Sequence, residues 1–77
     1  MNRVRRNALE KLMLKIEEVV SELETLKDEE DEYRDNMPEN LQYGERYEVS
    51  AAASEAMEYA MDNLTEAMDS INEAMGE

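Results

Sequence analysis

At 77 residues the chain is long enough for one small domain, and it contains neither cysteine nor histidine, which excludes disulfides, thiolate zinc sites and the commonest acid–base group near pH 7. Its 21 acidic residues outnumber 8 basic ones and give a net charge of −13, so we expect no direct binding to nucleic acid or to an acidic membrane, both of which need Lys and Arg. A single apolar core in so short a chain supplies only about 3–5 kcal/mol, so self-association is the remaining means of stabilisation.

The first residues are basic and then partly apolar. Arg3, Arg5 and Arg6 precede an apolar run that Lys11 and Lys15 interrupt. This is the pattern of neither a signal peptide nor a membrane span. We therefore expect a cytoplasmic protein.

Residues 3–35 are predicted to form the first helix, because their apolar residues alternate at spacings of three and four. The stripe consists of Leu9, Leu12, Ile16, Val19, Leu23, Leu26, Glu30, Tyr33 and Met37. Met13 and Val20 widen the stripe on one side. Pro38 cannot continue the hydrogen-bond ladder and pushes the residue before it out of the helical region, so the helix should end near Asp35.

Five successive acidic residues, 28–32, form a candidate cation site near the end of this helix. A calcium loop needs acids at alternate positions and a glycine at the sixth, where this chain has Tyr33. A helix also spreads successive carboxylates around its axis. We therefore expect a solvated helix end and no metal site.

Residues 36–44 are predicted to form the turn, with one short helical turn over 38–42 and Gly44 as a candidate cap for the next helix. Aromatic and basic residues flank this turn. They are Tyr33, Tyr43, Arg46 and Tyr47. Two interpretations stay open: a small cluster that seals the loop end, and an exposed aromatic patch that binds a partner.

Residues 45–75 are predicted to form the second helix. Its seam has the same three–four spacing and comprises Tyr47, Ser50, Ser54, Met57, Met61, Leu64, Met68, Ile71 and Met75. Alanine recurs every seven residues beside the seam, at Ala53, Ala60, Ala67 and Ala74. Alanine lets a neighbouring backbone approach, and methionine fills irregular gaps or forms an adaptable docking groove. We expect self-association through Met57, Met61, Leu64, Met68 and Ile71.

Two long helices and a short connection predict an all-α fold: an antiparallel, coiled-coil-like two-helix hairpin that forms a single domain over residues 1–77. Folding about the middle would place Tyr33 opposite Tyr47 and Leu26 opposite Ser54. Each apolar face is wider than a two-helix contact needs. We therefore expect a homodimer that forms a four-helix bundle.

The same hairpin would gather polar groups at both ends. Glu30 would lie near Ser50 as a polar layer that sets the register, or else stay exposed at a frayed end. The three N-terminal arginines would lie beside the acidic end of the second helix, near Met75 and Glu77.

The second helix also carries a row of acidic residues, and no Lys or Arg follows Arg46. The row comprises Glu48, Glu55, Asp62, Glu66, Asp69 and Glu73. The spacing along residues 62–73 averages about 5 Å of helix rise, and a duplex also presents regularly spaced negative charges. The face either mimics DNA and binds a basic host protein, or it is merely solvated.

Nothing in the sequence indicates catalysis. No serine has a base partner, no glycine-rich loop exists to bind phosphate, and carboxylate-bridged metal sites in bundles usually need Glu-x-x-His. We expect no enzyme, no cofactor and no catalytic residue. The expected function is a protein–protein interaction module that self-associates and works through its acidic and aromatic surface. The alternative is a phage-type inhibitor whose acidic face mimics DNA and blocks a host nucleic-acid enzyme or defence protein.

The central segment "DNMPENLQ", residues 35–42, together with Glu45-Arg46-Tyr47, resembles a family of small uncharacterised acidic proteins. They are helical-hairpin proteins of Firmicutes and of their phages and mobile elements. This chain has Gly44 where that pattern has serine, and methionine where it often has isoleucine. The resemblance implies origin and hairpin shape, and it carries no site residue.

Overall fold

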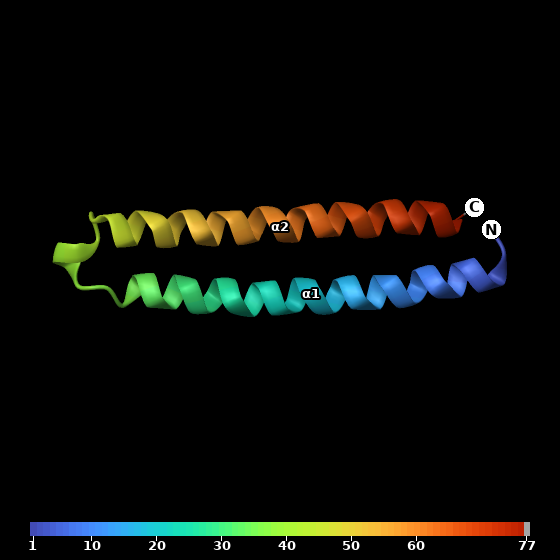
Figure 1. Ribbon diagram of the computed structural model, residues 1–77, viewed down its shortest axis with the longest axis horizontal. Coiled ribbons are helices and arrows are strands. Elements are labelled where there is room, and N and C mark those ends of the chain that lie inside the picture. The colour runs from blue at the N-terminus through green and yellow to red at the C-terminus, as the bar shows by residue number, and fades with distance from the viewer. Residues whose placement is uncertain (77) are drawn as a thin grey trace.

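The chain folds into an antiparallel helical hairpin (Figure 1). The computed structural model describes residues 1–76. Helix α1 spans Arg3–Asp35, the 3-10 turn η1 spans Glu39–Leu41 and helix α2 spans Glu45–Gly76. The two helices pack into a rod of 59 × 15 × 12 Å. The predicted all-α hairpin is therefore confirmed.

Helix α1 begins with a side-chain cap. Asn2 Oδ1 accepts a hydrogen bond from the backbone N–H of Arg5 at 2.8 Å, and the Asn2 carbonyl accepts one from Arg6 N–H at 3.1 Å. The side-chain bond satisfies one of the N–H groups that a helix start leaves without partners, and the carbonyl bond is the first of the regular helix bonds. The cap thus offsets part of the cost of placing arginines at the positive end of the helix dipole.

The connection holds itself together through short-range hydrogen bonds. Leu41 N–H donates to the Pro38 carbonyl at 2.9 Å, and Gln42 Nε2 donates to the Met37 carbonyl at 3.3 Å. The expected helical turn in this segment is present as η1. The segment therefore has a defined shape rather than being a loose tether.

Gly44 caps α2 with its backbone. Its carbonyl accepts from Glu48 N–H at 3.2 Å, and its own N–H donates to the Leu41 carbonyl at 3.1 Å. A Cβ at this position would lie only 3.3 Å from that Leu41 oxygen. The close approach of the turn explains why glycine, rather than a residue with a capping side chain, suits this position.

The seam that α1 presents to α2 differs in part from the expected one. Five of the nine residues of the expected stripe are half-buried, namely Leu9, Ile16, Leu23, Glu30 and Met37. The other half of the seam is formed by Arg6, Met13, Val20, Lys27, Asp31 and Arg34, which are also half-buried. The expected column of Leu12, Val19, Leu26 and Tyr33 is exposed instead. The helix is therefore rotated so that its second apolar column faces solvent.

The predicted register is also wrong. Ser54 Oγ lies 2.7 Å from Asp31 Oδ1, so Ser54 is level with Asp31 rather than with Leu26, five positions earlier. Tyr47 does not face Tyr33; its ring lies beneath the guanidinium of Arg34, 6.0 Å from Cζ. The reason is visible in Figure 1, where the connector continues past the end of α1 before the chain reverses, so that α2 begins farther out along the rod.

The start of α1 and the end of α2 lie at the same end of the rod (Figure 1). Basic and acidic ends are therefore neighbours, as predicted. Within residues 1–76, however, both ion pairs are internal to α1, Lys27–Asp31 and Arg34–Asp31. The N-terminal arginines thus form no ion pair with the described part of α2, and Glu77 lies outside the described residues.

The hairpin has no apolar core of its own in the described part of the chain. Only Ser50 and Ser54 are buried, at 3% and 5% exposure, and no hydrophobic side chain is. The surface measures 6016 Å², whereas a compact protein of 9.0 kDa exposes about 4,900 Å². A rod of two helices therefore leaves much of its apolar surface in water.

Candidate functional site

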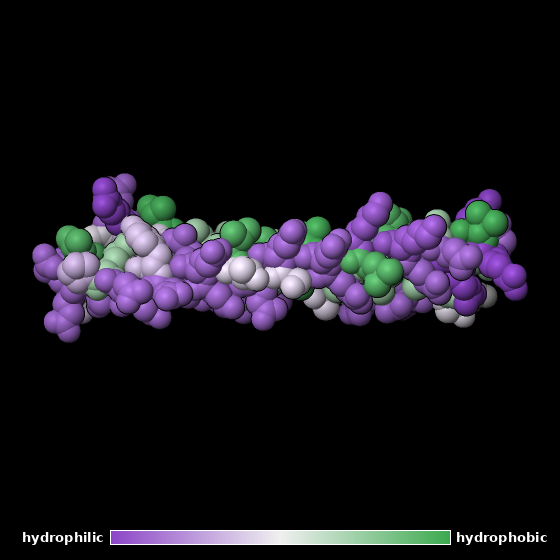
Figure 2. Space-filling model, turned by 90° about the horizontal axis from the view of Figure 1, so that it is seen from below, coloured by the Kyte–Doolittle hydropathy of each residue, from purple (hydrophilic) through white to green (hydrophobic). Residues whose placement is uncertain are grey.

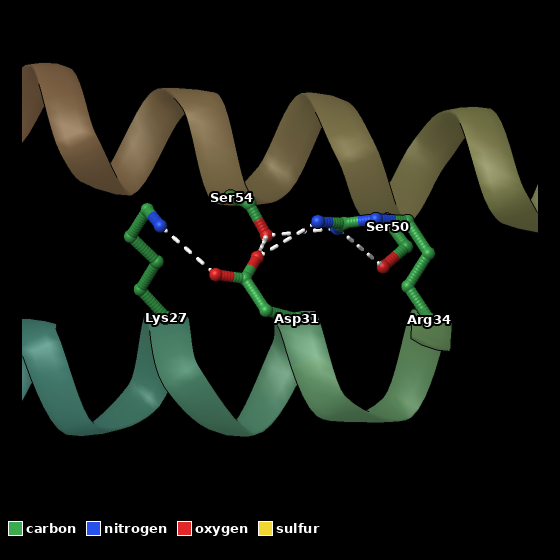
Figure 3. A network of polar contacts seen from close by, with 5 residues as sticks. All are labelled: Lys27, Asp31, Arg34, Ser50 and Ser54. Atoms are coloured by element: carbon green, nitrogen blue, oxygen red, sulfur yellow. Dashed lines mark hydrogen bonds and ion pairs between the residues drawn. The ribbon is translucent and has the colours of Figure 1, made fainter. Parts of the chain in front are cut away.

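Five side chains form a polar layer between the helices near the turn (Figure 3). Arg34 Nη1 donates to Ser54 Oγ at 2.9 Å and to Ser50 Oγ at 3.3 Å, and its Nη2 donates to Asp31 Oδ1 at 2.8 Å. Ser54 Oγ donates to Asp31 Oδ1 at 2.7 Å, and Lys27 Nζ donates to Asp31 Oδ2 at 2.9 Å. Every hydroxyl in the layer has a partner, so the buried serines carry little desolvation cost.

The expected polar layer therefore exists and includes Ser50 as predicted, but its other members differ. Glu30 is half-buried and lines a shallow pocket that Ser50 also lines, yet the bonds to the serines come from Asp31 and Arg34. The sequence contained a signal for this. Two adjacent seam positions of α2 are serines, Ser50 and Ser54, and hydroxyls in a seam need polar partners on the facing helix.

The layer perturbs the ionisation of Asp31. The hydrogen bond from Ser54, followed by those from Lys27 and Arg34, holds the pKa of the Asp31 carboxyl well below its usual value. The same contact with Asp31 raises the pKa of Lys27. Both shifts favour the charged forms, as expected for a carboxylate that accepts several hydrogen bonds. The layer therefore stays ionised at neutral pH.

We expect this ionisation to link stability to pH. Because the pKa of Asp31 is lower in the folded than in the unfolded chain, its contribution is complete above about pH 4 and is lost as the pH falls further. Urea denaturation at several pH values should show an advantage of the natural chain over Asp31→Asn at pH 7. That advantage should shrink below about pH 4. Comparing the two proteins cancels the titration of the other acids, and a pH-independent difference would contradict the assignment.

The tyrosines around the turn do not form one cluster. Tyr33 and Arg46 line a pocket of about 650 Å³ with apolar residues of the turn, including Met37 and Leu41. Tyr43 lies apart from this pocket and is 93% exposed. The loop end is thus not sealed, and the surface offers exposed aromatic rings, the type of residue enriched in binding hot spots.

The acidic row of α2 lies on its outer side. All six carboxylates, Glu48, Glu55, Asp62, Glu66, Asp69 and Glu73, are exposed. None of them has a basic partner within residues 1–76. Glu55 accepts a hydrogen bond from the Tyr59 hydroxyl at 3.0 Å, which raises the pKa of Tyr59. The row is therefore an uncompensated negative surface.

The residues expected to mediate self-association lie in the seam between the two helices and not on the outer surface. Met57, Met61, Leu64, Met68 and Ile71 are half-buried. They continue the seam of Ser50 and Ser54, which contact α1. They therefore hold the hairpin together, and in a bundle they would line a shared core.

A second apolar surface, which we call the apolar flank, lies on the outside of the hairpin. Its α1 residues were expected from the sequence to face the second helix. It consists of the exposed α1 column Leu12, Val19, Leu26 and Tyr33 and of the α2 column Ala53, Ala60, Ala67 and Ala74. Figure 2 shows hydrophobic side chains recurring along one edge of the rod, on a face that is otherwise largely hydrophilic. Exposed apolar stripes of this length mark interaction sites.

Neither a metal site nor a membrane segment is found in the part of the chain that the structure describes. No three acidic side chains there gather closely enough to hold a metal ion, because the run at 28–32 is spread around α1. Neither helix over residues 1–76 is long and apolar enough to span a bilayer. A comparison with protein families, curated proteins and solved structures finds no significant match to this chain.

Proposed function

We propose that this chain is a non-enzymatic protein–protein interaction module of the cytoplasm. It self-associates and binds a basic partner protein through the acidic row of α2 and the exposed aromatic residues of the turn. The observation that carries the proposal is the exposure of six carboxylates, none of which forms an ion pair within residues 1–76. Such a surface attracts basic partners over a distance and speeds their association.

A second candidate follows from the geometry of the same row. Its members occupy one side of the helix, and along residues 62–73 successive acidic residues are separated on average by about 5 Å of helix rise. A protein that binds DNA through phosphate contacts would find on this row negative charges that are regularly spaced, as the phosphates of a duplex are. Under this candidate the chain is a phage or mobile-element inhibitor that occupies the DNA-binding cleft of a host enzyme or defence protein.

The test is a retention experiment with the immobilised chain and a bacterial lysate. We expect basic proteins to bind at low salt and to be released in about 0.5 M salt, because screening acts on exposed charges. Changing the six acids of the row to Gln or Asn should abolish retention. The matched control changes six acids of α1 in the same way, at Glu10, Glu17, Glu18, Glu24, Asp28 and Glu32, and should retain the partner.

Three other results distinguish the proposals. Equal loss in both neutralised variants would show that only net charge matters and would contradict a specific acidic face. Release of the bound protein by added duplex DNA would support the DNA-mimic candidate. Retention that survives high salt but disappears in Tyr43→Ser would assign binding to the turn instead of the acidic row.

A further inference from the structure

We propose that the apolar flank is the docking surface for a second copy of the chain, with both turns at the same end of the dimer. This inference rests on the proposed self-association and specifies its surface and orientation. It starts from two columns: one of large, exposed side chains on α1, and one of alanines on α2 that is half-buried at Ala53 and Ala60 and exposed at Ala67 and Ala74.

The two columns lie side by side on the rod. Tyr33 and Ala53 line the same shallow pocket, together with Val49. Both columns repeat every seven residues and the helices are antiparallel, so this neighbourhood continues along the rod as Leu26 with Ala60 and, beyond it, Val19 with Ala67. The flank is therefore a ridge of large side chains beside a furrow of small ones.

Such a surface is complementary to itself. In a two-fold dimer the same patch meets itself, so each feature must find its complement on the identical partner. A two-fold axis along the rod places α1 of each copy over α2 of the other, and the ridge then enters the partner's furrow. An axis across the rod would instead set ridge against ridge. Only the first arrangement fills the alanine furrow, and it puts both turns at one end.

Charge also selects a second copy over a basic partner. The next column of α2, beside the alanines on the side away from the seam, is uncharged. It consists of Val49, Ala56, Asn63 and Ser70. The acidic row lies on another side of this helix, so two copies of net charge −13 can approach without facing their acidic rows to one another. Charged groups lie at the turn end of the flank, where Glu30, Glu45 and Arg46 line the pocket beside Tyr33 and Ala53. Along the rim of α1 the charged residues are Lys15, Glu22 and Glu29.

The available area is sufficient. A face of 59 × 15 Å offers on the order of 900 Å² per copy, and a stable interface buries about 800 Å² per partner. Docking would also remove much of the excess surface that the single hairpin exposes. The half-buried seam, including Leu23 and Met61, would then become the interior of a four-helix bundle.

Sedimentation equilibrium tests the surface with matched pairs. The natural chain should sediment as a dimer of 9.0 kDa subunits. Leu26→Glu should weaken dimerisation by about a hundredfold or more, whereas Leu14→Glu, at a residue that is 64% exposed off the flank, should not. Ala60→Leu should also weaken it by blocking the furrow, while Ala52→Leu on the outer side should have no effect. Circular dichroism of each variant checks that the helices persist.

The possible outcomes distinguish an error in the proposed interface from an error in the proposed self-association. A monomer at every concentration would overturn both proposals. A dimer that Leu26→Glu and Leu14→Glu weaken equally, or that Ala60→Leu strengthens, would overturn this interface alone. High salt should strengthen the dimer, because it screens repulsion between like-charged copies, and should weaken binding of a basic partner.

A spin label at Tyr43→Cys tests the orientation, since the chain has no other cysteine. With both turns at one end, the two labels should be separated by the width of the bundle, about 20–30 Å from interaxial distances of 8–10 Å. A separation near the 59 Å length of the rod would overturn the same-end arrangement.

Discussion

Leu23→Ala is expected to lower the free energy of unfolding by about 2–3 kcal/mol, which is most of the stability available to so small a domain. Leu23 is half-buried in the middle of the seam, where no other apolar layer lies behind it. Removing its side chain therefore takes away a large share of the contact between α1 and α2 at that level. Helix content should fall with it, because long amphipathic helices depend on tertiary packing more than on intrinsic propensity.

The matched control is Leu14→Ala. Leu14 belongs to the same helix but is 64% exposed and lies away from both the seam and the apolar flank. Alanine is the better helix former, so this change should leave the unfolding midpoint unchanged or slightly raised. Urea denaturation followed by circular dichroism at one protein concentration measures both variants. If the two lost equal stability, the helices would not be held by the seam described above.

The hairpin could be predicted from the sequence because its determinants are local. Pro38 cannot continue α1, and the apolar spacing on either side has the period of a helix. The bounds of the helices follow from these two facts. The rotation of α1 could not be predicted in the same way, because Leu9, Leu12 and Met13 are all apolar and periodicity alone does not decide which two of three columns face the partner.

The register and the polar layer depend on geometry that only the folded chain contains. The connector carries the chain beyond the end of α1 before it reverses, so that α2 is shifted along the rod. No single residue of the turn predicts this shift. Asp31 stands in a run of five acids, and nothing in the sequence singles out its carboxylate from those of its neighbours. What distinguishes it is that Ser54 and Arg34 lie within hydrogen-bond distance of its carboxylate. The exposed acidic row, by contrast, was evident from charge alone.

Arg34→Ala is expected to lower the free energy of unfolding by about 2 kcal/mol, since hydrogen bonds that involve a charged group contribute roughly 1.5–3 kcal/mol. The change removes the partner of the buried Ser50 hydroxyl and two bonds to Ser54 and Asp31. Arg34→Lys should not restore stability, because a single ammonium cannot reach these groups in the fork geometry of a guanidinium. Lys27→Ala is the control: it loses one bond within α1, and the loss should be clearly smaller.

Replacing the whole layer separates stability from specificity. A variant with Asp31→Leu, Arg34→Leu, Ser50→Ala and Ser54→Ala should be at least as stable as the natural chain, because apolar replacements avoid the desolvation of half-buried charged groups. The seam would then be apolar along its length, and helices related by a shift of one heptad would pack almost equally well. Backbone amide spectra should therefore show one set of signals for the natural chain and several for the variant. A single set in the variant would show instead that the turn, through Pro38 and Gly44, sets the register without help from the layer.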